Sequence, residues 1–128
     1  MSKPIILVVD DEKAVRFSLQ TVFTPDYRVF LAPDGEAALK LAEAQDPDIA
    51  IIDLMMENKD SGFILCYKMK QNNPAMPVII ASAVTAETGM SFGVETAADR
   101  SWIKADTFIE KGIRPDQLER EINKLLKI

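Results

Sequence analysis

The chain has no histidine among its 128 residues and only one cysteine. The lack of histidine excludes a Ser-His catalytic triad and a histidine-ligated zinc site, and no phosphohistidine can form on this chain. A single cysteine excludes an internal disulfide, which fits a reducing compartment. Cys66 falls within a helical pattern, so we expect it to be a core residue.

Long apolar runs and an excess of positive charge are also missing. The N-terminal apolar run, Ile5 to Val9, is too short to span a membrane and lacks the features of a signal peptide. The formal net charge of -5 disfavours non-specific binding to nucleic acid. We therefore expect a cytoplasmic protein that binds neither a membrane nor nucleic acid directly.

The composition, 48% hydrophobic and 27% charged, is typical of a globular domain that buries a core without disulfides or structural metals. The length fits one domain. We expect residues 1–128 to form that single domain, with no output domain attached.

Short apolar runs alternate with amphipathic segments along the chain. The runs predicted to be strands are 4–10, 27–32, 48–53, 77–82 and 106–111. The segments predicted to be helices are 12–23, 33–45, 61–71 and 114–128. Asp34 is the expected N-cap of the second helix, and Pro115 fits the first turn of the last. The segment 83–105 is irregular, with one weak helical pattern.

This alternation predicts an α/β fold: a doubly wound parallel sheet with helices on both faces. Ligands of such sheets bind at the carboxyl ends of the strands. Five positions share that edge in the predicted fold: Asp10, Asp11, Asp53, Ser82 and Lys111.

Each of these residues alone has an ordinary explanation, such as a helix cap or a solvated charge, but together they favour a phosphoryl-transfer site. Carboxylates that converge repel one another, and a hard cation such as Mg²⁺ offsets that repulsion. One carboxylate is then available as a nucleophile. A hydroxyl and an ammonium group stabilise the charge of a phosphoryl group, and Ser82 and Lys111 supply them.

The motifs "ILVVDDE", "IIDLMM", "PVIIASA" and "FIEKG" together resemble those of response-regulator receiver domains, the phosphoacceptor modules of two-component signalling. The resemblance covers nearly the whole chain. It implies the flavodoxin-like (βα)5 fold, with a five-stranded parallel sheet in the order 2-1-3-4-5. It also implies that the chain is not an enzyme beyond its own phosphorylation and dephosphorylation.

The resemblance assigns roles to individual residues. Asp53 matches the phosphorylated aspartate. Asp10, Asp11 and Asp53, with the backbone carbonyl of Met55, match the ligands of Mg²⁺, for which Mn²⁺ is an alternative. Contacts to the phosphoryl group are implied for three residues: Ser82, Ala83 and Lys111. Ser82 and Phe108 match the pair that switches conformation on phosphorylation.

The resemblance also implies the partners. Because this chain has no histidine, the phosphoryl group must come from a phosphohistidine on a separate histidine kinase or histidine phosphotransfer domain. The output partner is expected to be a protein, which the sequence does not name.

Three features depart from the family pattern. Glu57 replaces a customary proline in a loop that is about one residue longer than usual. Gly112 replaces the proline that usually follows the lysine through a cis bond. The segment between Ser82 and Phe108 is several residues longer than the norm and contains Trp102.

Other interpretations remain open at this point. The chain fits a receiver cut from a larger hybrid kinase or regulator. A phosphohydrolase of the haloacid-dehalogenase type also uses an aspartate at a strand end, but it needs a second acid where this chain has Met55. A flavin-binding electron carrier would need a less acidic loop after the first strand than "DDEK".

Overall fold

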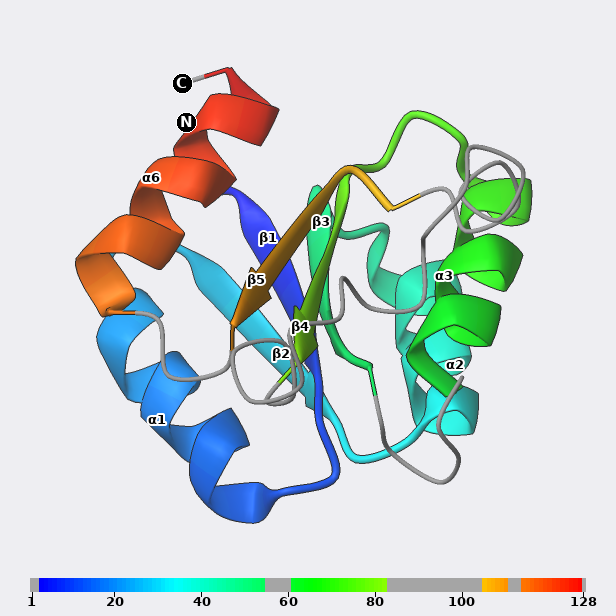
Figure 1. Ribbon diagram of the computed structural model, residues 1–128, viewed down its shortest axis with the longest axis horizontal. Helices are drawn as coiled ribbons and strands as arrows, with labels where there is room; N and C mark the ends of the chain where they lie inside the picture. The colour runs from blue at the N-terminus through cyan, green and yellow to red at the C-terminus, as the bar shows by residue number, and fades with distance from the viewer. Residues whose placement is uncertain (1–2, 55–60, 83–104, 111–113, 128) are drawn as a thin grey trace.

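The computed structural model describes residues 3–54, 61–82, 105–110 and 114–127 (Figure 1). Strands and helices alternate along the chain. The strands are β1 (Ile5–Val9), β2 (Arg28–Ala32), β3 (Ile49–Asp53), β4 (Val78–Ser82) and β5 (Thr107–Glu110). The helices are α1 (Lys13–Phe23), α2 (Gly35–Gln45), α3 (Ser61–Asn72) and α6 (Pro115–Leu126). The predicted bounds agree with these to within one or two residues, the usual uncertainty at the end of an element.

The strands form one parallel sheet in the order β2-β1-β3-β4-β5, which confirms the predicted fold. β3 lies in the centre, and all five of its residues are buried. A strand covered on both faces needs apolar side chains in both directions, which explains the unbroken run Ile49–Ile52. β5 lies at one edge of the sheet and is only partly buried.

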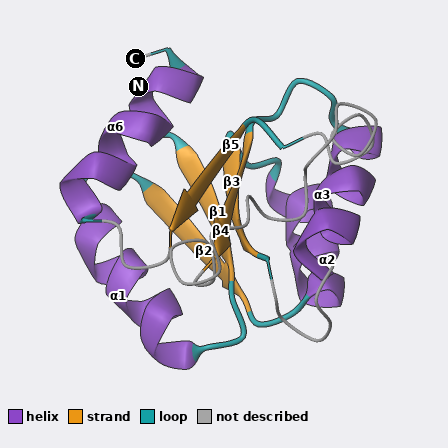
Figure 2. Ribbon diagram, viewed as in Figure 1, coloured by secondary structure: helices purple, strands orange, loops and turns teal. Residues whose placement is uncertain are grey.

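Helices cover both faces of the sheet, with α1 and α6 on one side and α2 and α3 on the other (Figures 1 and 2). The core is correspondingly divided in two. The cluster on the α1/α6 side includes Ile6, Ile51, Phe23 and Ile122, and the cluster on the α2/α3 side includes Leu7, Ile52, Cys66 and Met69. Side chains of one strand alternate between the two clusters, as the pleat requires.

Local signals in the sequence explain how the helices begin. The carboxylate of Asp34 accepts a hydrogen bond from the backbone N–H of Ala37 at 2.8 Å, which confirms the predicted N-cap of α2. Pro115 occupies the first turn of α6, where its missing N–H costs nothing. The apolar spacing in α1 was less reliable, because Phe23 is buried but Val22 is 40% exposed.

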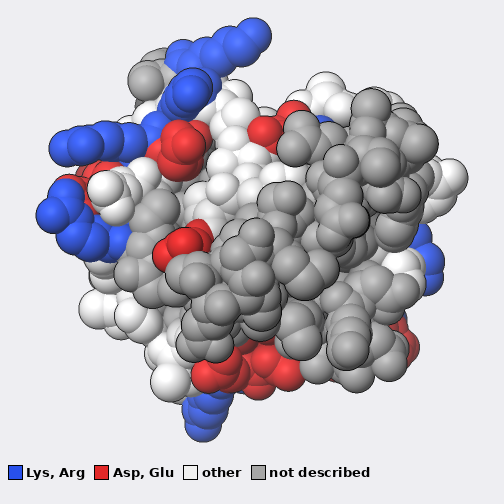
Figure 3. Space-filling view, in the orientation of Figure 1, with Lys and Arg blue, Asp and Glu red and all other residues white. Residues whose placement is uncertain are grey.

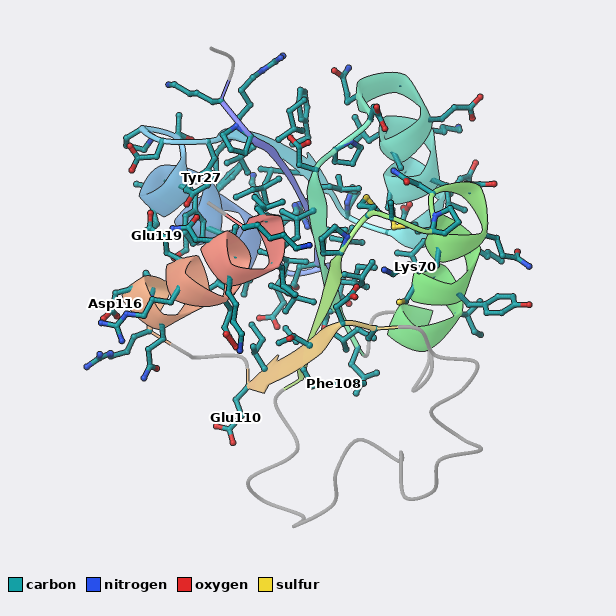
Figure 4. All side chains as sticks on the ribbon, turned by 90° about the horizontal axis from the view of Figure 1, so that it is seen from above. Tyr27, Lys70, Phe108, Glu110, Asp116 and Glu119 are labelled. Carbon is teal, nitrogen blue, oxygen red and sulfur yellow. The ribbon has the colours of Figure 1, made fainter. Side chains whose placement is uncertain are left out.

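Tyr27 connects the end of the first βα unit to the last helix. Its hydroxyl donates to Asn123 Oδ1 at 2.6 Å and lies 3.3 Å from Glu119 Oε2 (Figure 4). Its ring packs edge-on against Phe23, with 5.6 Å between the ring centroids. Within the described part of the chain, no helix is long and apolar enough to cross a membrane.

Candidate functional site

Asp10 and Asp53 lie next to each other at the carboxyl edge of the sheet. Val9 of β1 pairs with Ile52 of β3. The residues that follow these two, Asp10 and Asp53, therefore lie beside each other at the end of the sheet. Both are only 4% exposed, and they are the buried charged residues of the described core. Burying two carboxylates is costly unless other groups compensate for their charge, which marks this edge as a functional site.

Asp11 and Glu12 extend this acidic site into the loop between β1 and α1. Carboxylate oxygens of Asp10, Asp11 and Glu12 all lie within 4.8 Å of one another. Asp10 is buried, whereas Asp11 and Glu12 are exposed. In Figure 3 acidic side chains gather at the lower edge of the molecule, on the side where Figure 1 shows β1 leading into α1.

This set of donors suits a hard divalent cation. Mg²⁺ binds through one or two carboxylates and keeps several of its waters, so it needs an acidic site that is partly open to solvent. A buried Asp10 beside an exposed Asp11 and Glu12 meets both needs. The predicted ligands Asp10 and Asp11 are therefore brought together, with Glu12 as an addition.

Asp10 also organises the start of α1. Its Oδ1 accepts a hydrogen bond from the backbone N–H of Glu12 at 2.9 Å, and its backbone carbonyl accepts one from Arg16 Nη1 at 2.7 Å. Glu12, at the N-cap position of α1, makes no side-chain capping bond. Asp10 thus supplies an acceptor to this turn.

Asp53 is fixed by the strand on one side and by a close backbone contact on the other. The N–H of Leu54 donates to the carbonyl of Ala81 at 2.8 Å, which continues the β3–β4 ladder past Asp53. The N–H of Gly62 donates to the carbonyl of Leu54 at 2.9 Å. A Cβ atom on Gly62 would lie 2.6 Å from the carbonyl oxygen of Asp53, so only glycine fits here.

Apolar side chains surround the two buried aspartates. A cavity of about 100 Å³ lies on the α1/α6 side of the sheet, and Asp10 and Asp53 form part of its wall. The remainder of the wall is mainly apolar, with Val15, Leu19 and Ile109 among its residues. Interactions between charges are stronger in such surroundings than in water.

The other predicted site residues are described by the structure only in part or not at all. Ser82 ends β4, beside Glu110 in the register of β5, although its side-chain position is not described. Met55, Ala83 and Lys111 lie outside the described residues. So do Glu57, Gly112 and most of the long segment 83–105, including its weak helical pattern.

Phe108 and Glu110, both on β5, are described. Phe108 is partly buried and packs against the core cluster on the α2/α3 side. Glu110 is exposed and projects away from the sheet at the end of β5 (Figure 4). Because Phe108 pairs with Ile80 of β4, it is two positions away from the pair formed by Ser82 and Glu110.

Three residues of this site were not found by sequence reasoning: Glu12, Arg16 and Gly62. Glu12 directly follows the two aspartates, so its position in the acidic run was an available signal. The role of Arg16 depends on how the loop turns into α1. That of Gly62 depends on a contact between α3 and the backbone of β3, which no local pattern reveals.

Comparison with known proteins agrees with this fold. A family model described as the response regulator receiver domain matches residues 6–123. This chain belongs to the receiver domain family. Membership in this family favours the receiver interpretation over the two alternatives, a haloacid-dehalogenase phosphohydrolase and a flavin carrier.

Similar receiver sequences occur in regulators. The probable transcriptional regulator ycf27 of Porphyridium aerugineum is 32% identical over 128 residues, which is 99% of this chain and 50% of that protein. The alkaline phosphatase synthesis transcriptional regulatory protein PhoP of Bacillus subtilis is 31% identical over 95% of this chain and 48% of its own length. The chain therefore spans about half the length of these relatives.

Solved receiver domains have the same fold. The receiver domain of the Francisella response regulator 1452 superposes with a TM-score of 0.78 at 28% identity, covering 98% of both chains. That of NtrX from Brucella abortus gives 0.78 at 26% identity, over 95% of this chain and 98% of its own. A receiver domain protein from Methanospirillum hungatei has a TM-score of 0.80 at 23% identity, over 98% of this chain and 95% of its own, which shows likeness of fold.

Proposed function

We propose that this receiver domain accepts a phosphoryl group on Asp53 from a phosphohistidine of a separate kinase or phosphotransfer domain. The observation that carries the proposal is the register of β1 and β3, which places Asp53 beside Asp10, with both residues only 4% exposed. A carboxylate held rigidly at a strand end is positioned to attack in line.

The transfer exchanges one bond to phosphorus for another. A carboxylate oxygen of Asp53 attacks the phosphorus atom, the P–N bond of the phosphohistidine breaks, and an acyl phosphate forms. The imidazole nitrogen leaves with the bonding electron pair and takes up a proton. Hydrolysis of the acyl phosphate by water returns the free carboxylate, so the domain acts on itself and is not a metabolic enzyme.

Asp10, Asp11 and Glu12 would hold the Mg²⁺ near this carboxylate. When bound, such a cation neutralises negative charge on the phosphoryl oxygens. Asp10 keeps the β1–α1 turn in place through its bond to the N–H of Glu12. Ser82 and Lys111 are proposed to contact the phosphoryl group, as is Ala83, and the carbonyl of Met55 is proposed as a further metal ligand.

Phosphorylation is proposed to change the position of Ser82 and Phe108 and thereby the affinity for a protein partner. For this to occur, the phosphorylated site must favour one of two conformations over the other. Phe108 is partly buried on the edge strand β5, where a small rearrangement would change its exposure.

A direct test is incubation with Mg²⁺ and phosphoramidate, whose P–N bond resembles that of phosphohistidine, followed by intact mass measurement. We expect one phosphoryl adduct on the wild type, none on Asp53→Asn, and an undiminished adduct on Asp26→Asn, which removes an exposed carboxylate elsewhere. An unmodified wild type, or an adduct on Asp53→Asn, would contradict the proposal.

Metal binding is tested separately by titrating Mg²⁺ and following the thermal midpoint, which rises when a ligand binds the folded state. Asp11→Asn should weaken this response more than Glu12→Gln does, because the resemblance assigns Asp11 as a direct ligand. An equal response in both variants would contradict the assignment.

A second possibility concerns the extent of the native protein. Because the two regulators compared above are about twice as long as the matched region, we also propose that the receiver serves inside a longer regulator. The mass of the native polypeptide on an immunoblot distinguishes the two cases.

A further inference from the structure

A groove of about 790 Å³ opens between the C-terminal ends of α2 and α3. These helices run antiparallel to the strands, so the groove lies at the end of the molecule opposite the acidic site (Figure 1). Leu39 and Ala42 of α2 face Met69 of α3 and Met76 across it. Met69 and Met76 are buried in the core, whereas Leu39 and Ala42 are partly exposed, so the apolar surface open to a partner is that of α2.

The charged residues that line the groove are both acidic. Glu43 lies in the last turn of α2, and Asp46 is its C-cap in a left-handed conformation with φ of 48°. The last turn of α2 carries no basic residue. Because the C-terminal end of a helix already bears partial negative charge, two carboxylates there are unfavourable unless a cation lies nearby.

The end of α3 adds polar groups to the same wall. Asn72 and Asn73 line the groove, and the N–H of Met76 donates to the carbonyl of Asn73 at 3.2 Å. This turn leaves the groove bordered by amide groups on one side and carboxylates on the other. A partner with donor groups and positive charge therefore matches the border, and an apolar group matches the centre.

We propose that this groove binds a basic, amphipathic segment of a partner protein. An apolar side chain of the segment contacts the partly exposed Leu39 and Ala42, and a flanking lysine or arginine pairs with the exposed Glu43 and Asp46. The volume of about 790 Å³ accommodates several side chains, which favours a peptide segment over a single metal ion.

This surface is independent of phosphorylation at Asp53. The groove and the acidic site lie at opposite ends of the sheet, so both can be occupied at once. The inference does not rest on the proposed function, and the peptide experiment below needs neither Mg²⁺ nor a phosphodonor.

The probe is a synthetic amphipathic peptide of leucine and lysine, titrated into the ¹⁵N-labelled protein and followed by amide chemical shifts. We expect saturable shifts at the C-terminal ends of α2 and α3. A peptide in which glutamate replaces lysine should produce none. Glu43→Gln should weaken binding about threefold, the value of one exposed ion pair.

Two further variants make the result specific. Glu36→Gln removes the same charge from the first turn of α2, far from the groove, and should leave the affinity unchanged. Ala42→Lys places a positive charge inside the groove and should abolish binding while the protein stays folded, as circular dichroism would show.

Several outcomes would overturn the proposal. One is a set of amide chemical-shift changes centred on Asp10 and Asp11, which would mean that the peptide binds at the acidic site instead of the groove. Another is equal weakening by Glu36→Gln and Glu43→Gln. A third is an equal affinity for spermine with the same shifts, which would show that charge alone is recognised.

Discussion

The ammonium nitrogen of Lys70, on α3, lies 2.8 Å from Oδ2 of Asp106, which directly precedes β5. The same carboxylate oxygen accepts the backbone N–H of Val78 at 2.8 Å, and the N–H of Asp106 donates to the carbonyl of Val78 at 2.9 Å. Asp106 thereby joins the beginnings of β4 and β5, and Lys70 ties both to α3. The side chain of Lys70 is only 12% exposed, so this pair is shielded from solvent more than a surface pair is.

Removing Asp106 should destabilise the domain more than removing Lys70. Asp106→Ala loses the ion pair and leaves the N–H of Val78 without this acceptor, so we expect a loss of about 2 kcal/mol. Lys70→Met keeps the bond to Val78 and should cost about 1 kcal/mol. Urea denaturation measures the free energy of unfolding of both variants.

Because both variants break the same contact, the double variant should be less destabilised than the sum of the two. Lys40→Met, which breaks the exposed pair with Glu36, is the control and should change stability by less than about 0.5 kcal/mol. Strict additivity of Lys70→Met and Asp106→Ala would show that the pair contributes no coupling energy.

Gly62→Ala should destabilise the protein and reduce phosphorylation of Asp53. The new methyl group would lie 2.6 Å from both the carbonyl oxygen of Asp53 and the Cα of Leu54, so the backbone that carries the proposed acceptor must move. We expect a loss on the order of 2 kcal/mol. Thermal unfolding measures the loss of stability, and the reaction with phosphoramidate measures the reduced phosphorylation.

Gly35→Ala is the matched control for this change. Its nearest contact would be Leu65 Cδ1 at 3.7 Å, an ordinary van der Waals distance, and alanine favours the helix by up to about 1 kcal/mol. Gly35→Ala should therefore be neutral or stabilising. Equal losses in the two variants would refute the proposed steric cause.

Tyr27→Phe should cost about 1 kcal/mol at neutral pH, because the hydrogen bond to Asn123 is lost. Burial, followed by the nearby Glu119 carboxylate, raises the pKa of Tyr27 above its usual value. Above pH 10 the unfolded phenol loses its proton before the folded one, so the native state binds more protons and stability falls as pH rises.

The phenylalanine variant lacks this titration. The difference in unfolding free energy between wild type and Tyr27→Phe should therefore narrow above pH 10. Tyr67 and Cys66 are present in both proteins, so their contributions cancel. A difference that widens with rising pH would contradict the direction of the pKa shift.

Cys66 should be unreactive in the folded protein. Burial raises the pKa of its thiol to about 12, and Asp106 adds to the rise while Lys70 opposes it. Because thiol reagents attack the thiolate, labelling at pH 8 should proceed only as fast as the protein opens. Labelling in urea should be rapid, and rapid labelling of the native protein would contradict this assignment.

Much of this fold follows from local patterns in the sequence. Buried strands of a parallel sheet read as continuous apolar runs, and for this reason β1 and β3 were placed to within a residue. Asp34 and Pro115 marked helix starts through chemistry that acts within one turn. Spacing along α1 was less decisive, because the buried face is centred on Leu19 and Phe23 and leaves Val22 at its border.

The acidic site could be predicted in part, for a related reason. A parallel sheet brings its carboxyl ends to one edge, so Asp10 and Asp53 were expected to meet, and the register places them together. The contact of Gly62 with β3 arises only when α3 folds back on the sheet. The salt bridge between Lys70 and Asp106 joins residues 36 positions apart along the chain, and neither carries a local signal.

The hydrogen bond from the N–H of Gly62 to the carbonyl of Leu54 closes the chain on itself at the base of residues 55–61. Lengthening a segment whose two ends are pinned costs little, because closure entropy grows only slowly with length. The stretch that contains Glu57 can therefore be lengthened without displacing Asp53. The length of this segment is thereby separated from the position of Asp53, the proposed phosphoryl acceptor.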